Sequence, residues 1–185
     1  MNELINKSIK DHSQILNHIN TDMINSASEI VIDAVREGKT IFWCGNGGSA
    51  SQANHLSAEL IGGMYKEKIK PFTSVCLNVD TAFITAWSND DSFNNIFVRQ
   101  LEALGKSGDI LIGLSTSGNS LNILEAAKYA NSNKMKVVSF TGNDGGLLIN
   151  ESDVNINIES SSTQRIQELH ILVGHILCDI IENTL

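Results

Sequence analysis

Histidine and glutamate stand at helical spacing in one segment of the chain. His55 and Glu59 are four residues apart, so both side chains project from the same face of a helix. An imidazole nitrogen and a carboxylate oxygen are both zinc ligands, and this pair is therefore a sound half of a zinc site. The alternative is a solvated surface pair without chemistry, because His/Glu pairs at this spacing are common.

A second group of possible ligands lies near the end of the chain, at Gln167, Glu168, His170 and His175. Gln167 and His170 are one helical turn apart. Gln167 and His175 are eight residues apart, roughly 12 Å along a helix axis at about 1.5 Å per residue. That distance is near the combined reach of both side chains to one metal ion. Spacing alone favours His170 as the partner of Gln167.

Two loops have a composition suited to holding phosphate. CGNGGSAS (44–51) and STSGNSLN (115–122) each place Gly, Ser and Asn between an expected strand and an expected helix. Glycines let the backbone approach a ligand, hydroxyl groups donate hydrogen bonds, and a helix N-terminus favours an anion. The alternative is that both loops are turns in which Ser49 and Ser120 cap the following helices. Two such loops at equivalent places favour a binding site.

The elements that position these residues alternate between helices and strands. Amphipathic helices are expected over 3–18, 21–37 and 163–184. Short apolar runs predict strands at 40–44, 73–77, 109–114, 136–141 and, at a sheet edge, 153–158. Strands that alternate with helices imply right-handed crossovers and a buried parallel sheet of about five strands with helices on both faces. We expect one α/β domain over 1–185, with N-terminal helices at 1–38, a core at 39–160 and a C-terminal helix at 163–184.

The C-terminal segment has a wider apolar stripe than one surface helix needs. The stripe comprises Ile166, Leu169, Leu172, Val173, Ile176, Leu177, Ile180 and Ile181. Part of it is therefore expected to form an oligomer interface.

Composition limits the partners and the compartment. The 185 residues carry a formal net charge of −8 without a run of Lys or Arg, which argues against nucleic acid as a ligand. Three scattered cysteines in apolar runs, Cys44, Cys76 and Cys178, suggest reduced thiols in the cytosol. No apolar stretch approaches the roughly 20 residues of a membrane span. We expect a cytoplasmic protein without a membrane partner.

Several motifs together resemble one enzyme family. They are GNGGSA (45–50), NHLSAEL (54–60), Asn89–Asp90, GDILIGLSTSGNS (108–120), TGNDGG (141–146) and RIQELHILVGHIL (165–177). In collinear order from about residue 20 to the end, they are similar to the phosphoheptose isomerases, single-domain members of the sugar isomerase (SIS) superfamily. The STSGNS loop marks the superfamily, whereas HxxxE with RIQExHxxxxH marks this branch.

The resemblance implies a cytoplasmic homotetramer that binds a sugar phosphate and one zinc ion per subunit. It implies interconversion of sedoheptulose 7-phosphate and D-glycero-D-manno-heptose 7-phosphate, the first step toward bacterial heptoses. The implied metal ligands are His55, Glu59, Gln167 and His175, so the resemblance favours His175 where spacing favoured His170. The implied substrate-binding residues are Asn46, Gly47, Gly48, Ser49, Glu59, Asn89, Asp90, Ser115, Thr116, Ser117, Ser120 and Gln167.

The implied reaction moves a proton between adjacent carbons through an enediol. It needs a base, an acid for the carbonyl oxygen and stabilisation of oxyanion charge. Glu59 is the natural base, His175 the natural acid, and zinc could polarise the carbonyl group. His170 is then a helix-packing or interface residue. The long span from Gln167 to His175 suggests that ligands come from neighbouring subunits.

Two departures and two alternatives remain. Gly63 lies where many relatives have Arg, and Gln164 precedes Arg165 where an Asp is frequent, so substrate contacts can differ. One alternative is a non-catalytic tetrameric SIS scaffold that binds the replication initiator; that branch replaces the catalytic Glu and the second His, both present here. The other is a sugar-phosphate-binding regulatory module, but the N-terminal residues show no basic recognition helix.

Overall fold

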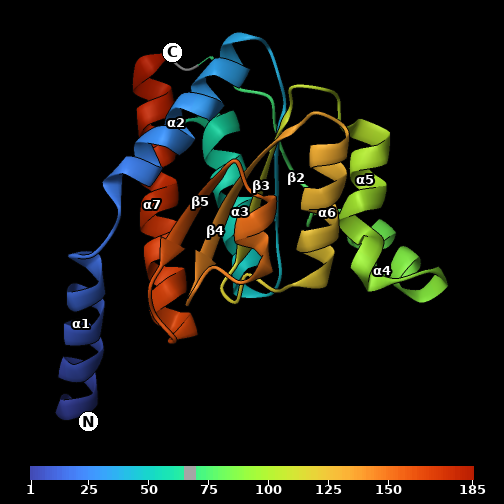
Figure 1. The fold of residues 1–185 in the computed structure, drawn as a ribbon. Coiled ribbons are helices and arrows are strands. Elements are labelled where there is room, and N and C mark those ends of the chain that lie inside the picture. The colour runs from blue at the N-terminus through green and yellow to red at the C-terminus, as the bar shows by residue number, and fades with distance from the viewer. Residues whose placement is uncertain (65–69) are drawn as a thin grey trace.

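Five parallel strands form the centre of the structure, a computed structural model that describes residues 1–64 and 70–185 (Figure 1). The sheet order is β2-β1-β3-β4-β5, and every neighbouring pair is parallel. The strands are β1 (Ile41–Gly45), β2 (Ser74–Cys76), β3 (Ile110–Ser115), β4 (Lys136–Gly142) and β5 (Val154–Ile158). The predicted sheet is confirmed, and the predicted edge strand, β5, lies at one end.

Helices cover both faces of the sheet, as expected (Figure 1). On one face, α2 (Thr21–Arg36), α3 (Gly48–Gly62) and α7 (Thr163–Thr184) enclose a core that includes Trp43. On the other face, α5 (Ile96–Leu104) and α6 (Leu121–Ser132) enclose a core that includes Phe42. The remaining elements there are α4 (Thr81–Asp90) and the short 3₁₀ helices η1 (Phe93–Asn95) and η2 (Leu147–Glu151). Adjacent residues of β1 thus point into opposite cores, as the two-residue repeat of a strand requires.

The first helix stands apart from the sheet. α1 (Asn2–Leu16) contains no buried residue and runs along the lower end of α7 (Figure 1). On α7, five members of the predicted stripe are buried, whereas Leu172, Ile176 and Ile180 stay at least partly exposed. The single chain thus leaves apolar surface open on both terminal helices, and the predicted oligomer interface stays a prediction. Across the described residues, no helix is long and apolar enough to span a membrane.

Helices α3 and α7 lie side by side and run in the same direction (Figure 1). Gly174 lets them approach closely, since a Cβ there would stand 2.4 Å from Leu56 Cδ1. Farther along the pair, the backbone N–H of Met64 donates to Glu182 Oε2 at 2.8 Å. These contacts set the register of the two helices, and with it which side chains of α3 meet which side chains of α7.

Candidate active site

Three of the four predicted metal ligands converge between α3 and α7. His55 Nε2 lies 2.8 Å from His175 Nε2 and 3.4 Å from Glu59 Oε1. One ligand atom from each residue fits within a mutual distance of 4.8 Å, the sole such group of His, Cys, Asp and Glu side chains among residues 1–64 and 70–185. His55 is exposed, whereas Glu59 and His175 are half-buried. The site is therefore open to a small molecule.

The donor set and its spacing fit zinc. Two imidazole nitrogens and one carboxylate oxygen are ordinary zinc ligands. Two nitrogens bound tetrahedrally at about 2.05 Å stand roughly 3.3 Å apart. The 2.8 Å between the His55 and His175 nitrogens means that the rings need to separate by only about half an ångström to accept the ion.

His170 points away from this cluster into the protein interior. Its side chain is fully buried, and its ring meets Phe140 edge-on. Nε2 lies 2.9 Å from the Thr141 carbonyl oxygen, an acceptor, so this nitrogen carries the proton and donates it. Burial lowers the pKa of His170 to about 4, so the ring is neutral at physiological pH. His170 has the helix-packing role that the resemblance implied, and the argument from spacing alone was wrong.

Gln167 lies away from this cluster, beside the first phosphate loop (44–51). A Cβ on Gly48 would stand 2.6 Å from Gln167 Nε2, so the amide rests directly on this backbone. Gly48 is the first residue of α3, seven residues or about 10 Å along the axis from His55. Gln167 thus adjoins the predicted substrate loop, and its role as a metal ligand stays a prediction.

The predicted phosphate loops form the starts of two helices. Gly47, with φ = 56°, is the N-cap residue of α3, and the buried Ser49 lies within the first turn. Ser120 is the N-cap residue of α6, but its hydroxyl accepts a hydrogen bond from Ser115 Oγ at 3.1 Å. Neither helix has a side-chain cap. Ser49 and Ser120 therefore do not cap these helices, so that part of the turn-and-cap alternative is wrong. The phosphate-binding role of the two loops stays a prediction.

The TGNDGG segment supports the second of these loops. Gly118, with φ = 64°, lies so close to the neighbouring backbone that a Cβ would stand 2.0 Å from the Gly145 carbonyl oxygen. The backbone N–H of Leu148 donates to Gly118 O at 2.9 Å, and that of Leu147 donates to Asn119 Oδ1 at 3.0 Å. The conformation of loop 115–120 is thus held by backbone contacts that tolerate only glycine at position 118.

Comparison with known proteins agrees with this geometry. A family model described as the SIS domain matches residues 6–142. The phosphoheptose isomerase of Helicobacter hepaticus is 44% identical over 99% of this chain and 94% of its own, and that of Nitratiruptor sp. is 42% identical over the full length of both. The structure of phosphoheptose isomerase from Neisseria gonorrhoeae matches with a TM-score of 0.92 at 36% identity, covering 98% of each chain. The chain belongs to the phosphoheptose isomerase family of SIS-domain proteins.

Two asparagines that the sequence analysis did not assign also belong to this site. Asn78 follows β2, and its side chain forms two hydrogen bonds with the backbone of Gly45. It accepts from the N–H at 3.1 Å and donates to the carbonyl oxygen at 2.8 Å. Asn122 on α6 exchanges two hydrogen bonds with Asn46. Asn78 had a sequence signal, because it stands where a strand ends; Asn122 lay inside the quoted loop motif without an assigned role.

Asn89 and Asp90 lie at the exposed end of α4, where Asn89 Nδ2 donates to Asp90 Oδ1 at 2.8 Å. Within the described residues, neither side chain has a hydrogen bond to either phosphate loop. Their role as substrate ligands stays a prediction.

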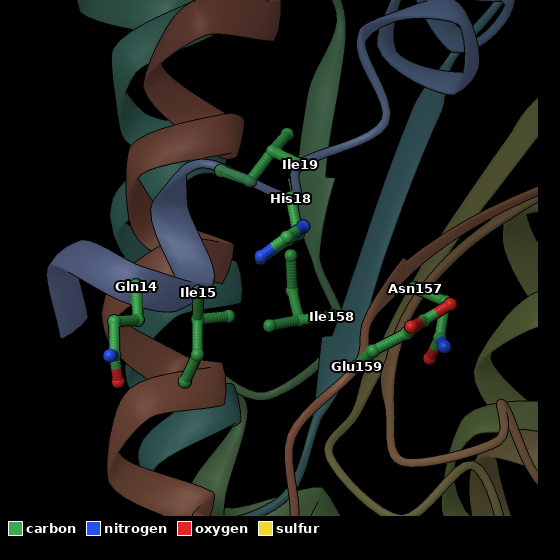
Figure 2. A pocket seen from close by; sticks show the side chains of 7 residues that line it. All are labelled: Gln14, Ile15, His18, Ile19, Asn157, Ile158 and Glu159. Carbon is green, nitrogen blue, oxygen red and sulfur yellow. The ribbon is translucent and has the colours of Figure 1, made fainter. Parts of the chain in front are cut away.

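A separate hollow of about 250 Å³ lies between the α1–α2 connection and the end of β5 (Figure 2). Its lining includes His18, Ile19 and Glu159, and none of the predicted site residues. This hollow is therefore distinct from the cluster of His55, Glu59 and His175.

Proposed function

We propose that this protein interconverts sedoheptulose 7-phosphate and D-glycero-D-manno-heptose 7-phosphate through an enediol. The observation that carries the proposal is the convergence of His55, Glu59 and His175, with His55 about two helical turns beyond the uncapped N-terminus of α3. Membership of the phosphoheptose isomerase family supports the same reaction. The arrangement offers both a phosphate cradle and a base beside a proton donor.

The two half-reactions need one base and one acid. The Glu59 carboxylate takes the proton from C1 of the ketose and returns it to C2, which forms the aldose. His175 donates a proton to the C2 oxygen as the enediol forms and accepts the C1 hydroxyl proton as it collapses. Its Nε2 is the ring nitrogen that faces His55.

One zinc ion per subunit is part of the proposal. His55, Glu59 and His175 would hold it, with Gln167 as the expected fourth ligand. When bound there, zinc acts as a Lewis acid that polarises the substrate carbonyl group. Because Gln167 rests on Gly48 in the single chain, its ligand role requires a rotation of its side chain or a copy from a neighbouring subunit.

The distance from the first phosphate loop to the cluster of His55, Glu59 and His175 suits a seven-carbon substrate. The phosphate group would lie at Asn46, Gly47, Gly48, Ser49, Ser115, Thr116, Ser117 and Ser120. Gln167, Asn89 and Asp90 would bind the hydroxyl groups of the chain. From Gly48 to His55 is about 10 Å along α3. An extended seven-carbon chain with its phosphate also spans about 10 Å at C–C bonds of about 1.5 Å, so C1 and C2 would reach Glu59.

We propose a homotetramer whose active sites adjoin the subunit interfaces. Support comes from the exposed apolar side chains of α1, such as Ile5 and Ile9, and from the exposed Ile176 of α7. The three buried free thiols suit a reducing cytoplasm. The product would serve as a heptose precursor for lipopolysaccharide or capsule. The scaffold alternative is disfavoured because Glu59 and His175 are both present and share one site.

The reaction is tested by incubating the zinc-loaded protein with sedoheptulose 7-phosphate in D₂O. Proton NMR should show aldose formation, with deuterium at C2 where the enediol exchanges its proton with solvent. The absence of aldose from folded, zinc-loaded protein would refute the proposed reaction.

The metal site is tested by zinc titration of two matched variants. His175→Ala should lose tight zinc binding, whereas His170→Gln should retain it because His170 faces the opposite side of α7. Zinc loss in the His170 variant with retention in the His175 variant would mean that the wrong histidine has been assigned.

A further inference from the structure

A reciprocal pair of amides joins the two phosphate loops. Asn46 Nδ2 donates to Asn122 Oδ1 at 2.8 Å, and Asn122 Nδ2 donates to Asn46 Oδ1 at 2.9 Å. Asn46 directly follows β1, and Asn122 lies in the first turn of α6. Asn122 is only 2% exposed, so it cannot itself contact much of a ligand, whereas Asn46 is half-buried. The pair crosses the gap between neighbouring strands, where ligands of open α/β sheets bind.

A backbone group fixes which way both amides point. The N–H of Ile123 is shared between Ser120 O at 3.1 Å and Asn122 Oδ1 at 3.0 Å. This donor favours the amide oxygen of Asn122 at that place over its NH₂ group, which would face another donor. With Oδ1 of Asn122 fixed, its Nδ2 must face Asn46, and only the oxygen of Asn46 can accept from it. The Asn46 amide is thereby held in one of its two possible orientations. It retains one N–H outside the pair.

The backbone around Asn46 is held independently of this pair. The side chain of Asn78 forms hydrogen bonds with both the N–H and the carbonyl oxygen of Gly45. The Gln167 side chain rests on Gly48. Removal of the Asn122 side chain should therefore free the side chain of Asn46, whereas the backbone of loop 44–51 should keep its conformation.

We propose that Asn122 is a positioning residue, which holds the free N–H of Asn46 toward the phosphate group of the substrate. This inference rests on the proposed function, because it assumes that the space between the two loops receives that phosphate. The hydrogen bond is oriented before the ligand arrives, so binding does not have to order a free side chain. Asn122 acts only through Asn46.

The experiment measures inorganic phosphate binding by calorimetry, and KM and kcat with sedoheptulose 7-phosphate, on the zinc-loaded protein. Asn122→Ala should weaken phosphate binding and raise KM about tenfold, the size of one lost hydrogen bond, with kcat within about threefold of wild type. The matched control is Asn131→Ala on the same helix, whose amide donates to Glu151 O away from the loops. It should leave all three quantities unchanged.

A double-mutant cycle separates positioning from general damage. In an Asn46→Ala background, Asn122→Ala should add no further change in phosphate affinity or KM. Independent effects that multiply in the double variant would overturn the proposal, as would unchanged phosphate affinity in the single variant. Should Asn122→Ala fail to fold, Asn122→Asp keeps the shape but loses the donor to Asn46, and it should weaken phosphate binding at least as much. The phosphate measurement stands even if the wild-type protein does not isomerise the sugar.

Discussion

The buried His170 should make the stability of this protein fall in mild acid. Its ring lies between α7 and β4, with Nε2 bonded to Thr141 O and Nδ1 buried without a hydrogen-bond partner. Burial lowers its pKa from the ordinary 6.5 to about 4, and the hydrogen bond to Thr141 opposes only part of that effect. Protonation in the folded state would place a charge on a ring that is fully buried and has no ion pair with a carboxylate among the described residues.

The sign and size follow from the two pKa values. In the unfolded chain, His170 is protonated below about pH 6.5. In the folded chain, it is protonated only below about pH 4. The free energy of unfolding is therefore not reduced by His170 above pH 6.5. It decreases as the pH falls from 6.5 to 4, and the effect of His170 is constant below pH 4. At about 1.4 kcal/mol for each tenfold difference in proton affinity, the loss is about 3 kcal/mol.

The comparison variant is His170→Gln, whose amide can still donate to Thr141 O but does not titrate. Urea unfolding at fixed protein concentration, with chelator present, gives the free energy of unfolding of both proteins from pH 8 to pH 4. The advantage of wild type over the variant should shrink by about 3 kcal/mol across this range and stay constant above pH 7.5. Parallel curves throughout would show that the His170 proton is not excluded by folding.

Three further predictions concern the candidate base and the second phosphate loop. Glu59→Gln should keep the fold but lower kcat at least about a hundredfold, because a general base contributes about 10²–10⁴-fold; a near wild-type rate in the NMR assay would remove Glu59 as the base. Ser120→Ala with Thr116→Val should raise KM more than it lowers kcat, since phosphate binding is largely the same in ground and transition states; steady-state kinetics decides, and an unchanged KM contradicts it. Gly118→Ala should cost about 2 kcal/mol and lower Tm by roughly 6 °C, because its Cβ meets the Gly145 carbonyl; thermal unfolding at wild-type temperature would show that the loop can relax.

Most of the fold was readable from the sequence because its signals are local. The central strands are continuous apolar runs, and each of the five predicted strands lies within one residue of its observed bounds. The C-terminal helix was expected over 163–184 and is observed as Thr163–Thr184, beginning after Ser162, whose hydroxyl caps it. The end of the first helix was predicted two residues too late, because Ile19 continues the apolar pattern beyond Leu16, where the helix ends.

The site was only partly predictable, because it depends on how one helix lies against another. Spacing within the last helix favoured His170, but His170 and His175 are about 140° apart around the axis at roughly 100° per residue. His170 shares the buried face with Leu169 and Val173, a face that the apolar stripe alone could have revealed. The contact of His175 with His55 was implied only by the resemblance, because spacing along the chain does not give the register of α3 and α7.

The starts of two helices give the phosphate loops a polarity that suits the proposed substrate. Helices α3 and α6 both begin at the carboxyl edge of the sheet, so their positive dipole ends lie beside the two phosphate loops. Residues 44–51 and 115–122 contain no Lys or Arg, so N–H groups, hydroxyls and dipoles would hold the phosphate dianion. A chain with a net charge of −8 can bind an anion in this way because the attraction is local to the helix ends.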